Sequence, residues 1–161
     1  MIYIWFRFEW QYSIAAILAL SHDVISTIGF FSLTSFEFNL ATIAAILTIA
    51  GYSINDTVVV FDRIRENFRR YKSWEQNDII NKSLNETLSR TVMTSVTTAL
   101  ALIAIMVFGG PVLRDFAAAM LWGVLIGTYS SIFIAAGVLT YVALNRSGDD
   151  TADIPKPEFE E

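Results

Sequence analysis

The chain has 161 residues, of which 54% are hydrophobic and 17% charged, and its net charge of −5 arises entirely from residues 149–161. A soluble domain of this size needs more charge to cover its surface, so the composition excludes an ordinary soluble fold and indicates a membrane protein. With no cysteine and a single histidine, His22, the sequence excludes disulfides, cysteine-ligated metals and a two-histidine metal site.

The first expected element in chain order is a short apolar segment at residues 1–8. Residues 1–8 are apolar and aromatic but too short to cross a membrane, so we expect an N-terminal helix remnant or an interfacial anchor. Four later segments approach or exceed the ~20 residues that cross a bilayer as a helix. They occupy about 12–33, 40–61, 91–110 and 116–144. We therefore expect an all-α, polytopic helical membrane protein with four full transmembrane helices.

The bundle is expected to occupy residues 1–145, and residues 146–161 to form an acidic disordered tail. Residues 62–90, called the hairpin below, separate the second and third spans. Apolar residues at helical spacing continue the second helix into this region. The sequence Ser73-Trp74-Glu75-Gln76 then matches a capping box that would open a new helix. Basic residues beside apolar ones favour an amphipathic helix near anionic headgroups, with a merely solvated hairpin as the alternative.

Basic residues are distributed unevenly between the two sides of the expected bundle. The hairpin and the two termini together hold ten Lys or Arg residues, whereas the opposite side holds only Arg114. Because loops rich in Lys and Arg stay in the cytoplasm, we expect the hairpin and both termini to be cytoplasmic.

Ionisable residues inside the spans are the candidate functional groups. Each costs about 2.5–3.5 kcal/mol at the centre of a membrane helix, so it needs a partner or a function. Asp23 lies near the middle of the first span beside His22, and Asp56 lies inside the second span beside Asn55. Arg90 stands where the third span begins. A buried carboxylate near such a cation can bind and release a proton as the cation approaches or retreats.

A polar stripe follows Arg90 along the third span, where Thr91, Thr94 and Thr98 recur at helical spacing. Each feature also fits a structural role. The threonines suit helix–helix contacts, Arg90 suits an interfacial anchor, and the adjacent His22 and Asp23 suit a local hydrogen-bonded pair. Asp56 is the hardest to explain structurally, because its helix has no cation before residue 63.

Small residues mark a packing face on the last span. Gly123, Gly127 and Ser131 are spaced four residues apart, a pattern that lets two membrane helices approach closely. We expect this face to contact a neighbouring helix or a partner subunit.

Residues 51–67 have the sequence GYSINDTVVVFDRIREN, which resembles the signature of the SecF branch of the SecD/SecF family of protein-export membrane proteins. Residues 19–24, 85–91 and 108–113 resemble further family motifs in the same order. The resemblance covers about 7–136 and does not reach the acidic tail.

The resemblance implies a member of the RND superfamily, which has six transmembrane helices and a large periplasmic domain between the first two. That first helix and domain have no counterpart here, so we expect the C-terminal transmembrane part of a SecF-like protein. The family implies SecD, the SecYEG channel, SecA and a YajC-type accessory subunit as partners in the bacterial inner membrane, and exported preproteins as substrates.

The family also implies that export is driven by the proton-motive force, with protons as the coupling ion and no cofactor. It implicates the positions of Asp56 and Arg90 in proton passage. We expect these two to form the coupling pair, and His22, Asp23 and the threonine stripe to line the route.

Other functional classes fit less well. An intramembrane aspartyl protease would use Asp23 and Asp56, but neither lies in a Tyr-Asp or Gly-x-Gly-Asp motif. No Gly-x-Ser-Gly motif of a rhomboid protease occurs, a zinc protease needs a second histidine, and no feature indicates nucleic-acid binding. The expected function is therefore that of a non-enzymatic translocase subunit. The alternatives are a structural membrane subunit without coupling activity and another RND-type exporter.

Overall fold

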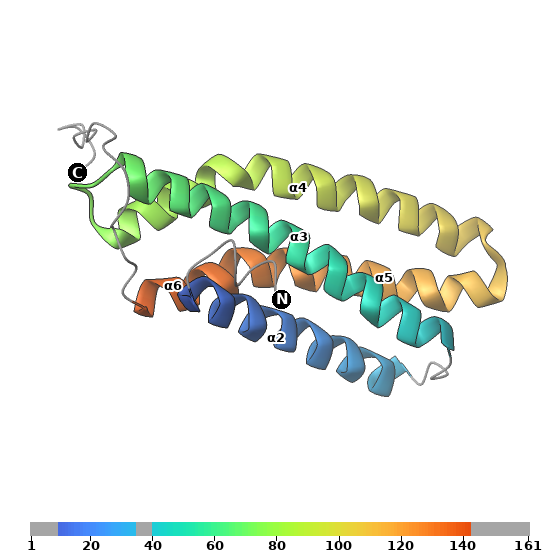
Figure 1. The fold of residues 1–161 in the computed structure, drawn as a ribbon. Helices are drawn as coiled ribbons and strands as arrows, with labels where there is room; N and C mark the ends of the chain where they lie inside the picture. Colours follow the sequence, from blue (N-terminus) through green and yellow to red (C-terminus); the bar gives the residue numbers. More distant parts are fainter. Residues whose placement is uncertain (1–9, 35–39, 143–161) are drawn as a thin grey trace.

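The computed structural model describes residues 10–34 and 40–142, and within these residues it contains helices and no strand. The long helices are α2 (Trp10–Thr34), α3 (Leu40–Arg70), α4 (Gln76–Phe108) and α5 (Gly110–Tyr129). After α5 the chain continues without a break into a π-helical segment, η1 (Ser130–Ala135), and a final short helix, α6 (Ala136–Tyr141). Figure 1 shows α3 and α5 between α2 and α4.

Four helices are long and apolar enough to cross a membrane. They are α2, α3, α4 and the continuous helix Leu113–Tyr141. The predicted all-α fold with four transmembrane helices is therefore confirmed. The predicted spans 12–33 and 40–61 lie within α2 and α3, whereas the remnant at 1–8 and the tail at 146–161 lie outside the described residues.

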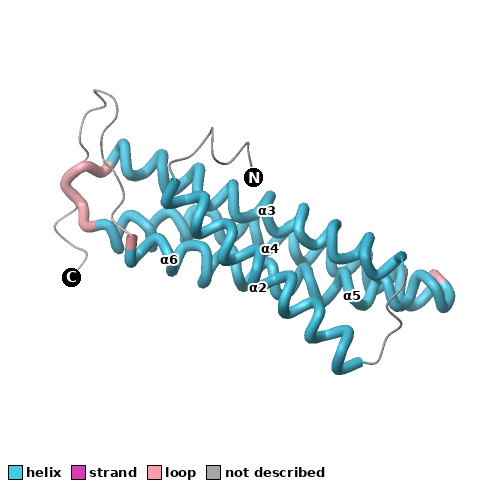
Figure 2. Tube along the Cα trace, turned by 60° about the horizontal axis from the view of Figure 1, so that its bottom comes forward, coloured by secondary structure: helices cyan, strands magenta, loops and turns pink. Residues whose placement is uncertain are grey.

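The third span ends slightly earlier than the predicted residue 110. The α4 helix stops at Phe108, where the backbone N–H of Gly109 closes the last turn on the Ile105 carbonyl. Gly110 then adopts φ 74°, a conformation that residues with a side chain rarely take. This turn and the hairpin loop lie at opposite ends of the bundle (Figure 2).

The capping box predicted at residues 73–76 is wrong. The N-cap of α4 is Glu75, which makes no side-chain capping hydrogen bond. In a capping box the Gln76 side chain would turn back to the N-cap backbone. Instead Gln76 Nε2 donates to the backbone carbonyls of Leu139 and Val142, at 2.6 and 2.9 Å. The Gln76 side chain, which a capping box would use, therefore makes a tertiary contact with α6 instead.

The start of α4 is determined by the packing of the hairpin loop. Trp74 is buried, and its ring lies 4.6 Å from that of Tyr71. The ammonium of Lys82 lies over both rings, 5.3 Å from the centroid of Tyr71 and 5.6 Å from that of Trp74. From Gln76 the helix then runs without interruption to Phe108, so the second arm of the hairpin and the third span are one helix.

The apolar interior consists of two separate clusters. The cluster nearer the hairpin is built around Phe61, Ile64, Ile80 and Leu139, and the other around Phe31, Ile49, Leu102, Met120 and Val124. On α2, α3 and α4, and in η1 after α5, buried polar residues lie between the two clusters. The bundle is therefore divided into three zones along its length: apolar, polar and apolar.

The predicted small-residue face of the last span packs against α3. A methyl group on Gly123 would lie 2.3 Å from a side-chain atom of Ile49, and one on Gly127 would lie 3.3 Å from Ser53 Cβ. Ser131 is also buried. The absence of side chains at these glycines therefore allows α5 to approach α3, at Gly123 within the second apolar cluster and at Gly127 beside Ser53 of the polar zone.

Candidate functional site

The middle zone of the bundle is the candidate functional site, and we call it the polar layer. It is formed by buried polar residues from α2, α3, α4 and η1, which are Asp23, Thr27, Ser53, Asp56, Thr57, Thr91, Ser95, Ser130 and Ser131. Polar groups inside a membrane bundle are costly unless they are hydrogen-bonded, and they commonly mark ion or substrate pathways. Because these residues gather between two apolar clusters, the hydrogen-bond partners of each one show whether its burial is compensated.

Asp23 is fully buried and hydrogen-bonded through both carboxylate oxygens. Its Oδ2 accepts hydrogen bonds from the hydroxyl of Ser53 on α3 and from the hydroxyl of Ser130 on η1, the latter at 2.8 Å. Its Oδ1 lies 3.1 Å from Nδ1 of His22. Asp23 thus joins three elements, α2, α3 and η1, and the predicted pairing of His22 with Asp23 is present.

Ser130, which donates a hydrogen bond to Asp23, is the first residue of the π-helical segment. A π-helical turn contains one more residue than an α-helical turn, and such turns in α-helices occur frequently at functional sites. The wider turn changes the face that later residues present. Ser130 therefore lies in the polar layer while Ala135, Ala136 and Leu139 pack in the hairpin-side apolar cluster.

Asp56 is also buried, with 5% of its surface exposed, but its surroundings differ. Its Oδ2 has no hydrogen-bond partner among the described residues. It lies three residues after Ser53 on α3, so both side chains share one face of that helix, one turn apart. Two buried carboxylates therefore occupy the same layer, one fully hydrogen-bonded and the other not.

Arg90 is the cation that acts electrostatically on Asp56. The two do not form an ion pair within 4.0 Å, and Arg90, which is exposed, forms none with any other residue in the described part of the chain. The structure therefore brings the predicted coupling pair into electrostatic range without direct contact.

The predicted threonine stripe divides between the inside and outside of the bundle. Thr91 is buried and Thr98 half-buried, whereas Thr94 and the predicted supporting residue Asn55 are exposed. The hydroxyls of Thr94 and Thr98 donate to carbonyls of their own helix. An intrahelical bond of this kind satisfies a hydroxyl in an apolar surrounding.

A neighbouring serine links the stripe to the next helix. Ser95 Oγ lies 2.5 Å from Thr128 Oγ1 on α5 and 3.5 Å from the hydroxyl of Tyr52 on α3. Ser95 was visible beside the stripe in the sequence, but its contacts with two other helices were not. The structure thus supports a helix-packing role for this part of the stripe.

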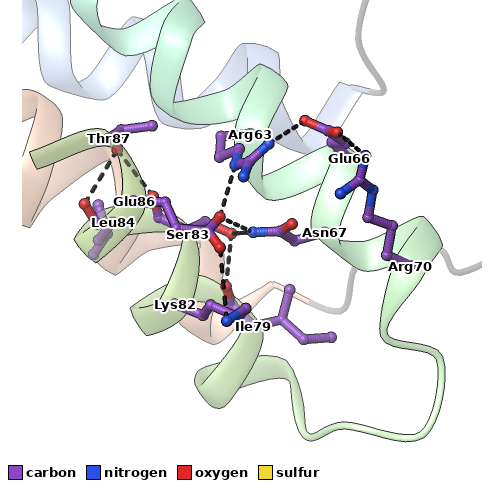
Figure 3. Close-up of polar contacts among 10 residues, drawn as sticks. All are labelled: Arg63, Glu66, Asn67, Arg70, Ile79, Lys82, Ser83, Leu84, Glu86 and Thr87. Atoms are coloured by element: carbon purple, nitrogen blue, oxygen red, sulfur yellow. Dashed lines mark hydrogen bonds and ion pairs between the residues drawn. The ribbon is translucent and has the colours of Figure 1, made fainter. Parts of the chain in front are cut away.

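A second polar region joins α3 and α4 within the hairpin, beyond the predicted spans (Figure 3). Arg63 Nε donates to Glu86 Oε2 at 2.7 Å, and Arg63 Nη1 donates to Glu66 Oε2 at 2.6 Å. Asn67 Nδ2 donates to the same Glu86 oxygen at 2.8 Å and to the hydroxyl of Ser83 at 2.9 Å. These residues form a hydrogen-bonded network across the two arms of the hairpin.

This network shifts the proton affinity of its members. Burial acts to raise the pKa of the Glu86 carboxyl, but hydrogen bonds from Asn67 and Arg63 and the charges of Arg63 and Lys82 outweigh it, so the pKa is lowered. Hydrogen bonds to Glu86 and Glu66 raise the pKa of the Arg63 guanidinium above its ordinary value. Both groups are therefore held in their charged forms.

Sequence reasoning missed several of these residues. Ser53 and Ser130, the hydroxyl partners of Asp23, were not predicted, although Ser53 lies one turn from Asp56 on the same helix face. The interhelical role of Arg63 and Glu86 also had no local sequence signal. In residues 10–34 and 40–142, no three His, Asp or Glu side chains gather to form a metal site.

Comparison with known families shows what the chain is similar to. The sequence model of the family described as "Protein export membrane protein SecD/SecF, C-terminal" matches residues 1–145. The chain is 54% identical to protein translocase subunit SecF of Rhodobacter capsulatus over 147 residues, which are 91% of this chain and 44% of that protein. It is 56% identical to the SecF of Rickettsia bellii, covering 89% of this chain and 47% of that protein. The chain thus spans about half the length of these curated relatives.

Solved structures give a consistent result. The crystal structure of SecDF, a translocon-associated membrane protein from Thermus thermophilus, superposes with a TM-score of 0.84 at 50% sequence identity. The match covers 87% of this chain and 20% of that one. SecDF in its super-membrane-facing form gives a TM-score of 0.83 at the same identity, covering 87% of this chain and 19% of that one.

Proposed function

Because this chain belongs to the SecD/SecF C-terminal family of protein-export membrane proteins, we propose that it is a subunit of the bacterial Sec protein translocase. In this role it assists protein export across the cytoplasmic membrane, driven by the proton-motive force. The observation that carries the coupling part of the proposal is Asp56, a buried carboxylate with an unpartnered oxygen in electrostatic range of Arg90.

The proposed coupling step is a change of charge at Asp56. When ionised, the carboxylate attracts Arg90, and when protonated it releases that cation. Because the two side chains belong to different helices, each protonation change alters the force between α3 and α4. Moving one charge through 100 mV supplies about 2.3 kcal/mol, so a few protons per cycle are enough to drive a domain movement. Protons are the coupling ion in this proposal, and no cofactor takes part.

The rest of the polar layer forms the proposed proton route. Asp23 and His22 reach it through Ser53, which lies one turn from Asp56 on the same face of α3. Thr91 and Thr98, with the exposed Thr94 and Asn55, extend the polar surface along α4 and α3. Hydroxyl and imidazole groups can both donate and accept, which proton transfer requires.

The proposal includes partners and a location. Exposed Asn55 and Arg90 on a membrane bundle require a protein or water partner, and a SecD-type subunit would provide one. We propose further association with the SecYEG channel, SecA, a YajC-type subunit and exported preproteins, all in the bacterial inner membrane. The basic hairpin and both termini face the cytoplasm and its anionic lipids in this arrangement.

The main alternative is a structural membrane subunit without coupling activity. The specific observation in its favour is that Asp23, one of the two buried acids, is fully hydrogen-bonded by Ser53, Ser130 and His22 and ties three elements together. A carboxylate used in this way needs no proton transfer to explain it. Export of lipids or drugs by another RND-type mechanism has no comparable support, because the relatives reported above are named translocase subunits.

The test is a preprotein-export assay in vesicles under an imposed proton gradient. Asp56→Asn and Arg90→Ala are each placed in the chain within its complex with a SecD-type partner. Asp115→Asn, which changes an acid at the far end of the bundle, is the matched control. We expect either site substitution to abolish the stimulation by the gradient while expression and assembly stay normal. Retention of the stimulation in both variants would show that the pair is structural.

A further inference from the structure

A cleft of about 320 Å³ opens between α3 and α4 on the hairpin side of the polar layer. Its lining consists of Val59, Asp62, Arg63 and Glu66 from α3, and Glu86, Thr87 and Arg90 from α4. A single water needs only about 10–15 Å³ of such space, so the cleft is large enough for several waters. Five of the seven lining side chains are charged, so the cleft suits water rather than lipid.

The cleft reaches the neighbourhood of the proposed proton-binding group. Val59 follows Asp56 by three residues, which places it one helical turn away on α3. Arg90, which also lines the cleft, is the cation that acts on Asp56. The unpartnered Oδ2 of Asp56 therefore lies one turn beyond the lining of a charged cleft.

One ion pair crosses this cleft. Arg63 on α3 holds Glu86 on α4 at 2.7 Å, and Asn67 reinforces the contact by donating to the same oxygen. The other ion pairs of the network stay within one helix, between Glu66 and Arg63 or Arg70 on α3 and between Lys82 and Glu86 on α4. In the described part of the chain, the contact between Arg63 and Glu86 is thus the ion pair that joins the two walls.

We propose that Arg63 and Glu86 are positioning residues that close the hairpin-side access to Asp56 by joining the two walls of the cleft. This inference rests on the proposed function, in which Asp56 binds the coupling proton. When the pair separates, water in the cleft gains a path toward Asp56, and when it forms, the path is closed. A half-exposed ion pair is a weak link, which suits a contact that must break and re-form in each cycle.

The first test replaces the charges of the pair in the complex with a SecD-type partner. Glu86→Gln and Arg63→Gln are compared with Arg70→Gln, which removes an ion pair of the same network that does not cross the cleft. Export and proton entry into vesicles are measured together under an imposed gradient. Loss of one such contact shifts a two-state equilibrium by about five-fold, so we expect roughly that fall in export per proton for the first two variants. The control should retain the normal ratio.

An unchanged ratio in Glu86→Gln, or an equal fall in Arg70→Gln, would overturn the proposal. A merely structural role would lower assembly and overall export without changing the number of protons used per exported chain. The ratio therefore separates a positioning role from loss of folded protein.

A second test does not depend on the Gln variants assembling. The chain contains no cysteine, so Arg63→Cys and Glu86→Cys introduce the two thiols needed for a reducible bifunctional cross-linker. We expect cross-linking to stop gradient-driven export and proton entry, and reduction to restore both to the level of the double variant before cross-linking. The matched control joins Asn77→Cys to Asn81→Cys, two exposed positions one turn apart on α4 outside the cleft, and should have no effect. Full export by the cross-linked protein would contradict closure at this position.

Failure of this inference can be distinguished from failure of the proposed function. If Asp56→Asn keeps its response to the gradient, the proposed function is wrong. If Asp56→Asn loses the response while the Glu86 variant and the cross-linked protein behave normally, the proposed function stands and only the closure by Arg63 and Glu86 is wrong.

Discussion

Asp23 and Asp56 are both buried acids on neighbouring membrane helices, yet Asp23 accepts hydrogen bonds from hydroxyls on two other elements, while Asp56 keeps an oxygen with no partner in the described structure. A buried polar group without a partner is costly, whereas a satisfied one ties elements together. Asp23 thus ties α2, α3 and η1 together, whereas Asp56 has the oxygen that the proposed function uses to bind a proton. The positions of the two acids within their spans do not distinguish them, whereas their hydrogen-bond partners do.

The largest expected effect on stability comes from removing the satisfied carboxylate. Asp23→Ala leaves the buried hydroxyls of Ser53 and Ser130 without their acceptor, and each stranded group costs about 1–3 kcal/mol. Asp56→Asn removes no hydrogen bond from Oδ2 and should leave stability nearly unchanged. Thermal unfolding of the complex in detergent, at constant pH and lipid content, measures both. Equal destabilisation by the two substitutions would remove the distinction between the two acids.

A smaller effect is expected from overpacking between α5 and α3 in the second apolar cluster, next to the polar layer. A methyl group added by Gly123→Ala would lie 2.3 Å from Ile49, so α5 must move away from α3. Overpacking of this kind costs about 1–3 kcal/mol in total. Gly51→Ala is the matched control, because a methyl group there meets nothing within 4 Å. It should be neutral or stabilising by about 0.5–1 kcal/mol, the helical preference of Ala over Gly.

The same unfolding measurement applies to both glycine variants. If Gly123→Ala is as stable as Gly51→Ala, the close approach of α5 to α3 at Gly123 does not contribute to the stability of the bundle.

The smallest expected effect is on the hairpin and depends on pH. The pKa of Glu86 is lowered in the folded protein, so its contacts stabilise the hairpin above the ordinary value of 4.5 and are lost as the pH falls through the lower folded value. Hydrogen exchange of residues 63–70 and 79–87, corrected for intrinsic rates, should be flat from neutral pH to about 5 and rise below 4.5. Glu86→Gln should remove most of this acid dependence. An acid transition of the same size in Glu86→Gln would assign it to another carboxyl.

Much of the fold was determined by the sequence itself. The lengths of the apolar segments specify four membrane helices, because in hydrocarbon the backbone must satisfy its hydrogen bonds within the helix. Asp23, Asp56 and Arg90 could be identified by the cost of charge in that surrounding, and Gly123 and Gly127 by their spacing. These are local properties that require no knowledge of a neighbour.

Tertiary structure decided what these residues do. Whether a buried carboxylate is satisfied depends on hydroxyls far away in sequence, such as that of Ser130 at the start of the π-helical segment, which donates to Asp23. The predicted capping box is wrong for the same reason, since the Gln76 side chain donates to the carbonyls of Leu139 on α6 and of Val142, which follows α6. The contact between Arg63 and Glu86 likewise exists only after α3 and α4 pack together. Hydrophobicity is a sum over a segment and can be read from a single chain, whereas a hydrogen bond needs a partner that only the packed bundle provides.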